Sequence, residues 1–204
     1  TKAADALKWV ADECDKIKNQ VPFRYSDETN NWGRVNGATA YALKARALLY
    51  RASELNNHGN DGSYGREAAQ AAKDFMTENA KQSKPYKLYT TGKPENDYYE
   101  CFITNPVFND EFILCRSIWK TRAIEDFCSP VGYAGVQDVH GRTNPTQNFV
   151  DCFEMADGKR IDETGSNYDP QNPYVNRDPR LAQIVIHQGS MWGQLQVLNL
   201  YIQQ

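Results

Sequence analysis

The sequence lacks the features that mark several large classes of protein. No apolar run approaches the roughly 18 residues that a membrane-spanning helix needs. The opening residues, TKAADALKWV, do not combine the basic and apolar regions of a signal peptide. Basic residues number 23 and acidic residues 26, and the two kinds are mixed along the chain, so no basic surface is indicated. The sequence therefore predicts neither a membrane-spanning helix nor a nucleic-acid partner.

Both ends of the sequence also lack start and stop signals. Thr1 leads almost directly into a helical pattern, and the final NLYIQQ ends without a turn or a capping residue. We therefore expect the chain to be the middle piece of a longer protein.

Cysteine and histidine are too scattered to predict a metal site or a disulfide framework. The cysteines include no C-x-x-C pair, and each has apolar or aromatic neighbours, which is typical of buried free thiols. They are Cys14, Cys101, Cys115, Cys128 and Cys152. The histidines, His58, His140 and His187, are far apart and have no second ligand at metal spacing. We expect no metal site, and thiols that pack as small apolar side chains.

No motif of a familiar catalytic or nucleotide-binding site is present. The sequence contains no G-x-S-x-G nucleophile elbow, no G-x-x-x-x-G-K-[ST] loop and no G-x-G-x-x-G fingerprint. NHGNDGSYGREA resembles a calcium loop. Aligning Gly62 on the invariant glycine of such a loop, however, places Gly59 at a ligand position and Ala68 where the glutamate belongs. The sequence predicts no catalytic residue and no cofactor.

The first part of the chain has helical periodicity. Apolar residues at i, i+4 and i+7 predict a helix over 3–18, and alanine-rich sequence predicts a second over 37–56. A third is predicted over 66–81, after the Gly- and Asn-rich loop NNHGNDGSYG. The expected apolar faces are Ala3, Leu7, Val10, Cys14 and Ile17 in the first helix, and Ala68, Ala72, Phe75 and Met76 in the third. We expect the second and third helices to pack antiparallel, either as a tetratricopeptide-like unit or as a generic αα-hairpin.

After Pro85 the helical periodicity fades. EFILCRSIWK, residues 111–120, predicts a strand, and residues 121–143 are expected to be irregular. PTQNFVDCFEM predicts a short helix with Thr146 as its N-cap. ADGKRID predicts a turn, and LAQIVIHQ predicts a helical turn or a strand.

The segment NRDPRL predicts a helix start. Asp178 can cap the helix, and Pro179 suits the first helical position because its φ is fixed and its N–H is missing. Arg177 and Arg180 are then placed to pair with nearby carboxylates or loop carbonyls. We interpret this segment as a structural staple in preference to a ligand clamp.

Aromatic residues of the irregular part are candidates for a binding site. Aromatic residues make up 12% of the chain, and several lie outside the periodic stretches. Ring faces on loops suit flat, partly apolar ligands such as sugars, and nearby polar side chains supply hydrogen bonds. The candidates are Trp119, Phe127, Tyr133 and Trp192, with Arg122 and Gln137 as polar partners. The alternative for each aromatic residue is that it covers the core beneath the loops.

Five segments occur in an order and approximate spacing that resembles the SusD/RagB family. They are GRVNGATAYALKARALLYRA, YKLY, NDEFILCRS, PTQNFVDCFEMADGKRID and PYVNRDPRL, and the resemblance runs from Trp32 to Trp192. That family consists of surface-exposed outer-membrane lipoproteins. The chain departs from the family pattern because it lacks the lipobox cysteine, the first helices and the C-terminal helices. Membrane attachment is therefore expected only through a lipid anchor that is absent from this chain.

The resemblance implies a mainly α fold with tetratricopeptide-like helix pairs, a loop-rich region and a few short strands. Residues 1–84 would form the helical part and residues 85–204 the loop-rich part, both within one larger SusD-like domain. The implied activity is non-catalytic binding of glycans at the cell surface and their delivery to a SusC-like TonB-dependent outer-membrane transporter. Arg177, Asp178 and Arg180 are expected to form the fold and not to contact sugar.

Two other functions remain open. Acidic residues near the aromatic region, such as Glu125 and Asp126, would suit a helical glycoside hydrolase, whose chemistry depends on the separation of two carboxylates in space. The helix pair within residues 37–81 would also suit a scaffold that binds a protein segment. Release of reducing ends from a polysaccharide discriminates the hydrolase from the binding protein.

Overall fold

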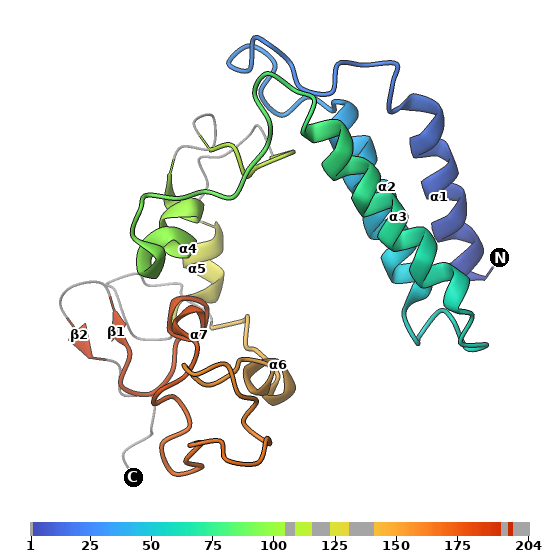
Figure 1. The fold of residues 1–204 in the computed structure, drawn as a ribbon. Coiled ribbons are helices and arrows are strands. Elements are labelled where there is room, and N and C mark those ends of the chain that lie inside the picture. Colours follow the sequence, from blue (N-terminus) through green and yellow to red (C-terminus); the bar gives the residue numbers. More distant parts are fainter. Residues whose placement is uncertain (1, 105–108, 116–122, 131–140, 193–195, 198–204) are drawn as a thin grey trace. The chain divides into compact units, whose positions relative to one another are not determined.

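The computed structural model describes residues 2–104, 109–115, 123–130, 141–192 and 196–197. Within these residues the protein has seven helices and one two-stranded hairpin (Figure 1). The expected mainly α fold is therefore confirmed. No helix in this part of the chain is long and apolar enough to cross a membrane. The chain forms two compact units, one of residues 1–92 and 100–118 and the other of residues 93–99 and 119–204.

Three long helices build the first unit: α1 (Ala3–Ile17), α2 (Gly37–Ala52) and α3 (Gly62–Asn79). They run alternately up and down, and α2 packs against both α1 and α3 (Figure 1). Their shared core consists of Ala11, Leu48, Ala68 and Ala71, with Ala45 beside it. Alanine is the most frequent residue in this core because small side chains allow the helix axes to approach closely. The three predicted helices and the antiparallel packing of the last two are confirmed.

The helix boundaries differ from the predicted ones where local side chains bond to the backbone. Helix α2 ends at Ala52, four residues before its predicted end, because the Ser53 hydroxyl and the Asn56 amide both donate to the Tyr50 carbonyl. Helix α3 begins at Gly62, four residues early, because the Asp61 carboxylate accepts the Ser63 N–H at 2.8 Å and caps the helix. The glycine-rich composition of the loop obscured that cap.

The buried faces also differ in detail from the predicted ones. Cys14 is buried as expected, but Ile17, the last residue of α1, is 45% exposed. In α3, Ala68 is buried as expected, but Ala71 is buried in place of Ala72, and Met76 is 61% exposed, so the prediction is wrong for Ala72 and Met76. Phe75 packs against the Phe23 ring, with ring centroids 5.7 Å apart.

The start of α2 is fixed by Asn36 and Gly37. The Asn36 carboxamide oxygen accepts both the N–H and the hydroxyl of Thr39, so Asn36 caps the helix. A Cβ on Gly37 would lie 2.7 Å from the Lys18 carbonyl oxygen and 3.0 Å from the Phe23 Cα. Only glycine allows the chain that leaves α1 to pass this close to the first turn of α2.

The strand predicted over residues 111–120 is wrong for the part that the structure describes. Helix α4 (Pro94–Ile103) is followed, after a gap, by residues 109–115, which form turns and bends. The buried Asn109 side chain accepts the Glu111 N–H and donates to the Cys101 carbonyl, which bends the chain back toward α4. Residues 116–120 lie outside the described residues.

The second unit contains short helices and the hairpin. Helix α5 (Ala123–Cys128) lies in the segment that was expected to be irregular, so that prediction is wrong for these residues. Helix α6 (Gln147–Asp151) begins as predicted, with the Thr146 side chain accepting the Phe149 N–H. Strands β1 (Met191–Trp192) and β2 (Gln196–Val197) pair antiparallel.

Helix α7 (Pro179–Ile184) confirms the helix start that was predicted in NRDPRL. The Asp178 carboxylate accepts the Arg180 N–H at 2.9 Å, and Pro179 is the first helical residue. Arg177 is 6% exposed and donates to the carbonyls of Pro173, Val150 and Phe153. These bonds tie the segment before α7 to the end of α6 and hold it over the local core, which consists of Val150, Leu181 and Val185.

The cysteines are all free, but they do not all pack as small apolar side chains. Cys14 and Cys101 are buried, as predicted, and burial raises the pKa of both thiols. Cys115 and Cys128 are half-buried, and Cys152 is exposed just after α6, so the prediction is wrong for Cys152.

Candidate functional site

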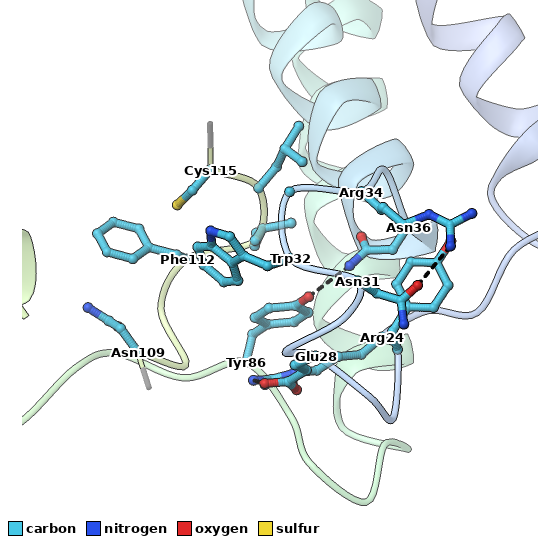
Figure 2. A pocket seen from close by; sticks show the side chains of 14 residues that line it. Arg24, Glu28, Asn31, Trp32, Arg34, Asn36, Tyr86, Asn109, Phe112 and Cys115 are labelled. Carbon is cyan, nitrogen blue, oxygen red and sulfur yellow. Dashed lines mark hydrogen bonds and ion pairs between the residues drawn. The ribbon is translucent and has the colours of Figure 1, made fainter. Parts of the chain in front are cut away.

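A pocket in the first unit collects aromatic and polar side chains from three stretches of the chain. The stretches are the connection between α1 and α2, the segment after α3, and residues 109–115 (Figure 2). The space between these side chains, counted together with the solvent into which it opens, is about 420 Å³. The lining side chains include Arg24, Tyr25, Glu28, Asn31, Trp32, Arg34, Asn36, Tyr86, Asn109 and Phe112.

One end of the pocket is aromatic. Trp32 and Phe112 lie toward this end in Figure 2, and Ile113 and Leu114 extend the apolar lining. The Phe112 ring is supported by an edge contact with Phe102, with ring centroids 6.3 Å apart. Trp32 is half-buried, so part of its ring remains open to a ligand. Flat rings of this kind match the C–H faces of a sugar ring.

The other end of the pocket is polar. Arg34 donates to the Asn31 carboxamide oxygen at 2.8 Å, and the Asn36 amide donates to the Tyr86 hydroxyl at 3.0 Å. Gly33 stands between Trp32 and Arg34 with a φ of 75°, a left-handed conformation that favours glycine. This turn directs the two neighbouring side chains toward different ends of the pocket (Figure 2).

Tyr86 is held firmly although it follows a helix end. The Asn79 side chain accepts the Tyr86 N–H and donates to the Tyr86 carbonyl, each at 2.8 Å. The Tyr86 ring makes an edge contact with Phe23, with ring centroids 6.2 Å apart. Arg24 covers the other side of the ring, with its guanidinium carbon 4.4 Å from the ring centroid. The phenol is thereby fixed before any ligand arrives.

An ionic cluster joins the three stretches beside the pocket. Arg24 bonds to both Glu28 carboxylate oxygens and, at 2.7 Å, to the Asp110 carboxylate. Lys84 lies 2.8 Å from Glu28 and 3.5 Å from Asp110. The Arg24 side chain is only 9% exposed, whereas that of Lys84 is 55% exposed, so the arginine at the centre of the cluster is shielded from solvent and the edge of the cluster is not. The cluster fixes the connection between α1 and α2 against the segments that begin at Lys84 and at Asn109.

The two carboxylates of the cluster are unsuited to acid catalysis. Burial alone would raise the pKa of Glu28 and of Asp110, but the bonds from Arg24 and Lys84 outweigh it and hold both pKa values below the ordinary range. A glycosidase needs one carboxylic acid with a raised pKa to protonate the leaving oxygen. Neither Glu28 nor Asp110 meets this need. Among the described residues, no three carboxylate, histidine or cysteine groups are placed to hold a metal ion.

The residues predicted from sequence fall in the second unit or outside the described part of the chain. Trp119, Arg122, Tyr133 and Gln137 lie outside the described residues. Phe127 lies on α5, is 43% exposed, and has the Arg142 guanidinium carbon 4.8 Å from its ring centroid. The backbone of Trp192 ends β1. Phe127 does not line the pocket of the first unit.

Sequence reasoning missed the residues of this pocket. The stretch YSDETNNWGRVN lies between two predicted helices and holds Tyr25, Asn31, Trp32 and Arg34 close together. An aromatic and polar connection of this length was the available signal. The contributions of Tyr86 and Phe112 come from distant segments and had no local signal.

Comparison with known proteins identifies one family. The sequence model of the SusD family matches residues 82–204, more than half of the chain. No curated protein matches the chain, and no solved structure does. The matched region includes Tyr86 and residues 109–115 of the pocket, and the NRDPRL segment of the second unit. This chain belongs to the SusD family.

Proposed function

We propose that the chain binds glycans without cleaving them. In the cell it would do so at the surface of the outer membrane, as part of a lipid-anchored protein that delivers the glycan to a SusC-like TonB-dependent transporter. Membership of the SusD family supports this proposal. The lipid anchor and the transporter are inferred from family membership alone.

The observation that carries the proposal is the composition of the pocket in the first unit. Trp32 and Phe112 offer ring surfaces, while Asn31, Asn36 and Tyr86 offer donors and acceptors for hydroxyl groups. In Figure 2, Phe112 and Trp32 lie toward one side of the pocket and Asn31 and Asn36 toward the other, with Tyr86 beside Trp32. A sugar presents the same two kinds of surface, C–H faces and a rim of hydroxyls, so the pocket matches it on both counts.

The state of the carboxylates supports binding in preference to hydrolysis. Glu28 and Asp110 are bonded to Arg24 and kept ionised, so neither can act as the proton donor of a glycosidase. Their role in the pocket is to hold its walls together.

The aromatic residues of the second unit remain a second proposed contact region. Phe127 is exposed on α5 and accompanied by Arg142. Together with Trp119, Tyr133, Trp192, Arg122 and Gln137 it would add stacking and hydrogen-bonding groups for a longer glycan. This region lies within the residues matched by the family model.

Two measurements on the full chain test the proposal. A glycan array should show retention of at least one class of oligosaccharide. Incubation with the retained glycan should release no reducing ends, because neither Glu28 nor Asp110 can act as the proton donor. Steady release of reducing ends would replace the proposal with a glycoside hydrolase, and an array without any bound glycan would contradict it.

A further inference from the structure

Among the described residues, Arg34 differs from the other pocket arginine in having no acidic partner. It makes no ion pair there, and its side-chain hydrogen bond is to the neutral Asn31. Arg24, in contrast, bonds to both Glu28 and Asp110. Arg34 is also exposed, so an incoming ligand can reach its guanidinium group.

The acidic groups around the pocket are already bonded to other partners. Glu28 accepts from Arg24 and Lys84, and Asp110 accepts from Arg24 with two lysines nearby. Asp27, in the same connection as Arg34, accepts both the backbone N–H and the side-chain amide of Asn30. An anion that approaches Arg34 therefore does not compete with a carboxylate that holds the arginine.

The Arg34 side chain is held in place before a ligand arrives. One terminal nitrogen donates to Asn31 at 2.8 Å, and the guanidinium carbon lies 5.5 Å from the centroid of the Tyr25 ring. The Tyr25 hydroxyl in turn donates to the Val35 carbonyl at 3.2 Å, which fixes the ring. Among the described residues, the edge formed by Nε and the second terminal nitrogen of Arg34 has no acceptor. Such an edge binds an oxyanion through two parallel N–H···O bonds.

We propose that the pocket selects glycans that carry an anionic group, and that Arg34 binds this group. The inference rests on the proposed glycan binding and names the class of glycan. The anionic group is a uronate carboxylate or a sulfate ester, since both present two oxygens to the guanidinium edge. The ring of the same or the next sugar would contact Trp32, which is separated from Arg34 by a single glycine.

The test compares three oligosaccharides of matched length by calorimetric titration of the full chain. They are an oligogalacturonate, a sulfated chondroitin oligosaccharide and a neutral cello-oligosaccharide. Arg34→Gln should weaken binding of the preferred anionic oligosaccharide about tenfold, because a charge-assisted bond is lost. The matched control is Arg66→Gln, which removes an exposed arginine of the same unit that also makes no ion pair among the described residues. This control should bind like the wild type, and circular dichroism should show both variants folded.

The possible outcomes separate this inference from the proposed function. Tighter binding of either anionic oligosaccharide, lost in Arg34→Gln and kept in Arg66→Gln, supports the inference and identifies the anion. Equal weakening of anionic oligosaccharide binding in both variants would indicate general attraction by positive charge, and it would overturn the inference. Preference for the neutral oligosaccharide also overturns it, while glycan binding itself stands. If a broad array shows no bound glycan of any class, the proposed function fails as well.

Discussion

Replacing Arg24 by methionine should destabilise the protein by about 2 kcal/mol. The guanidinium bonds to Glu28 twice and to Asp110 once, and it covers the Tyr86 ring. Removing one partner of a buried pair costs about 3–5 kcal/mol when the remaining charge has no other partner. Here Lys84 stays within 2.8 Å of Glu28, so the cost should fall below that range. Methionine keeps the apolar stem over the ring, which limits the loss to the ionic bonds.

The assay is urea unfolding monitored by circular dichroism, with Lys16→Met as the control. Lys16 pairs with Glu13 on the surface of α1, where its side chain is 64% exposed. Breaking such a pair should cost about 0.5 kcal/mol or less. A loss for Arg24→Met as small as that of the control would show that the cluster contributes no net stability, and the reasoning would be refuted.

The pH dependence gives the same prediction a second check. The folded-state pKa values of Glu28 and Asp110 are depressed below their unfolded values. The stability that they contribute is therefore present above the ordinary carboxyl pKa of about 4 and is lost as the pH falls through the folded values. The difference in stability between wild type and Arg24→Met should narrow below about pH 4. A difference that stays constant as the carboxylates are titrated with acid would mean that the lost stability comes from packing alone.

Three further changes have expected outcomes. Gly37→Ala should destabilise the protein by about 2 kcal/mol, because the new Cβ would lie 2.7 Å from a backbone carbonyl oxygen. Gly65→Ala, in open space within α3, should instead stabilise the protein by about 0.5–1 kcal/mol, and thermal melts of both variants check these values. Asp178→Ala should lower the free energy of unfolding by about 1 kcal/mol at pH 7, because the helix cap is lost. Since the bond from Arg180 lowers the pKa of Asp178, this difference should shrink as acid protonates Asp178 in the wild type. An unchanged melting temperature would show that Asp178 does not stabilise the helix. Trp119→Ala and Tyr133→Ala should each weaken glycan binding several-fold, because each removes a stacking contact of roughly 1 kcal/mol. Wild-type affinity in both variants would show that the second proposed region does not contact the glycan.

The features that were predictable from sequence are those set by residues close together in the chain. The helices over 3–17 and 37–52 follow from apolar periodicity, which repeats within each helix. The Asp178 cap with Pro179 behind it is a bond between neighbours, so six residues were enough to predict it. The sequence also predicted that Arg177 would bond to loop carbonyls, but it did not predict which ones.

The pocket could not be predicted in the same way because distant residues form it. The Arg24 and Asp110 side chains that meet at 2.7 Å are 86 residues apart in sequence. The composition of residues 111–115 predicted a strand, but the hydrogen bond from Asn109 to the Cys101 carbonyl bends this segment. No local sequence pattern indicates that bond. Aromatic residues could be counted from sequence, whereas their gathering around Trp32 depends on the tertiary fold.

The most direct test of glycan binding by the pocket is calorimetric titration of Trp32→Ala and Trp9→Ala with the glycan that the array identifies. Trp32 lines the pocket, and Trp9 is a 64% exposed tryptophan on α1 that does not. Loss of one stacking contact of roughly 1 kcal/mol should weaken binding several-fold in Trp32→Ala and leave Trp9→Ala at the wild-type affinity. Wild-type affinity in Trp32→Ala, with its fold intact, would show that the glycan does not bind in this pocket.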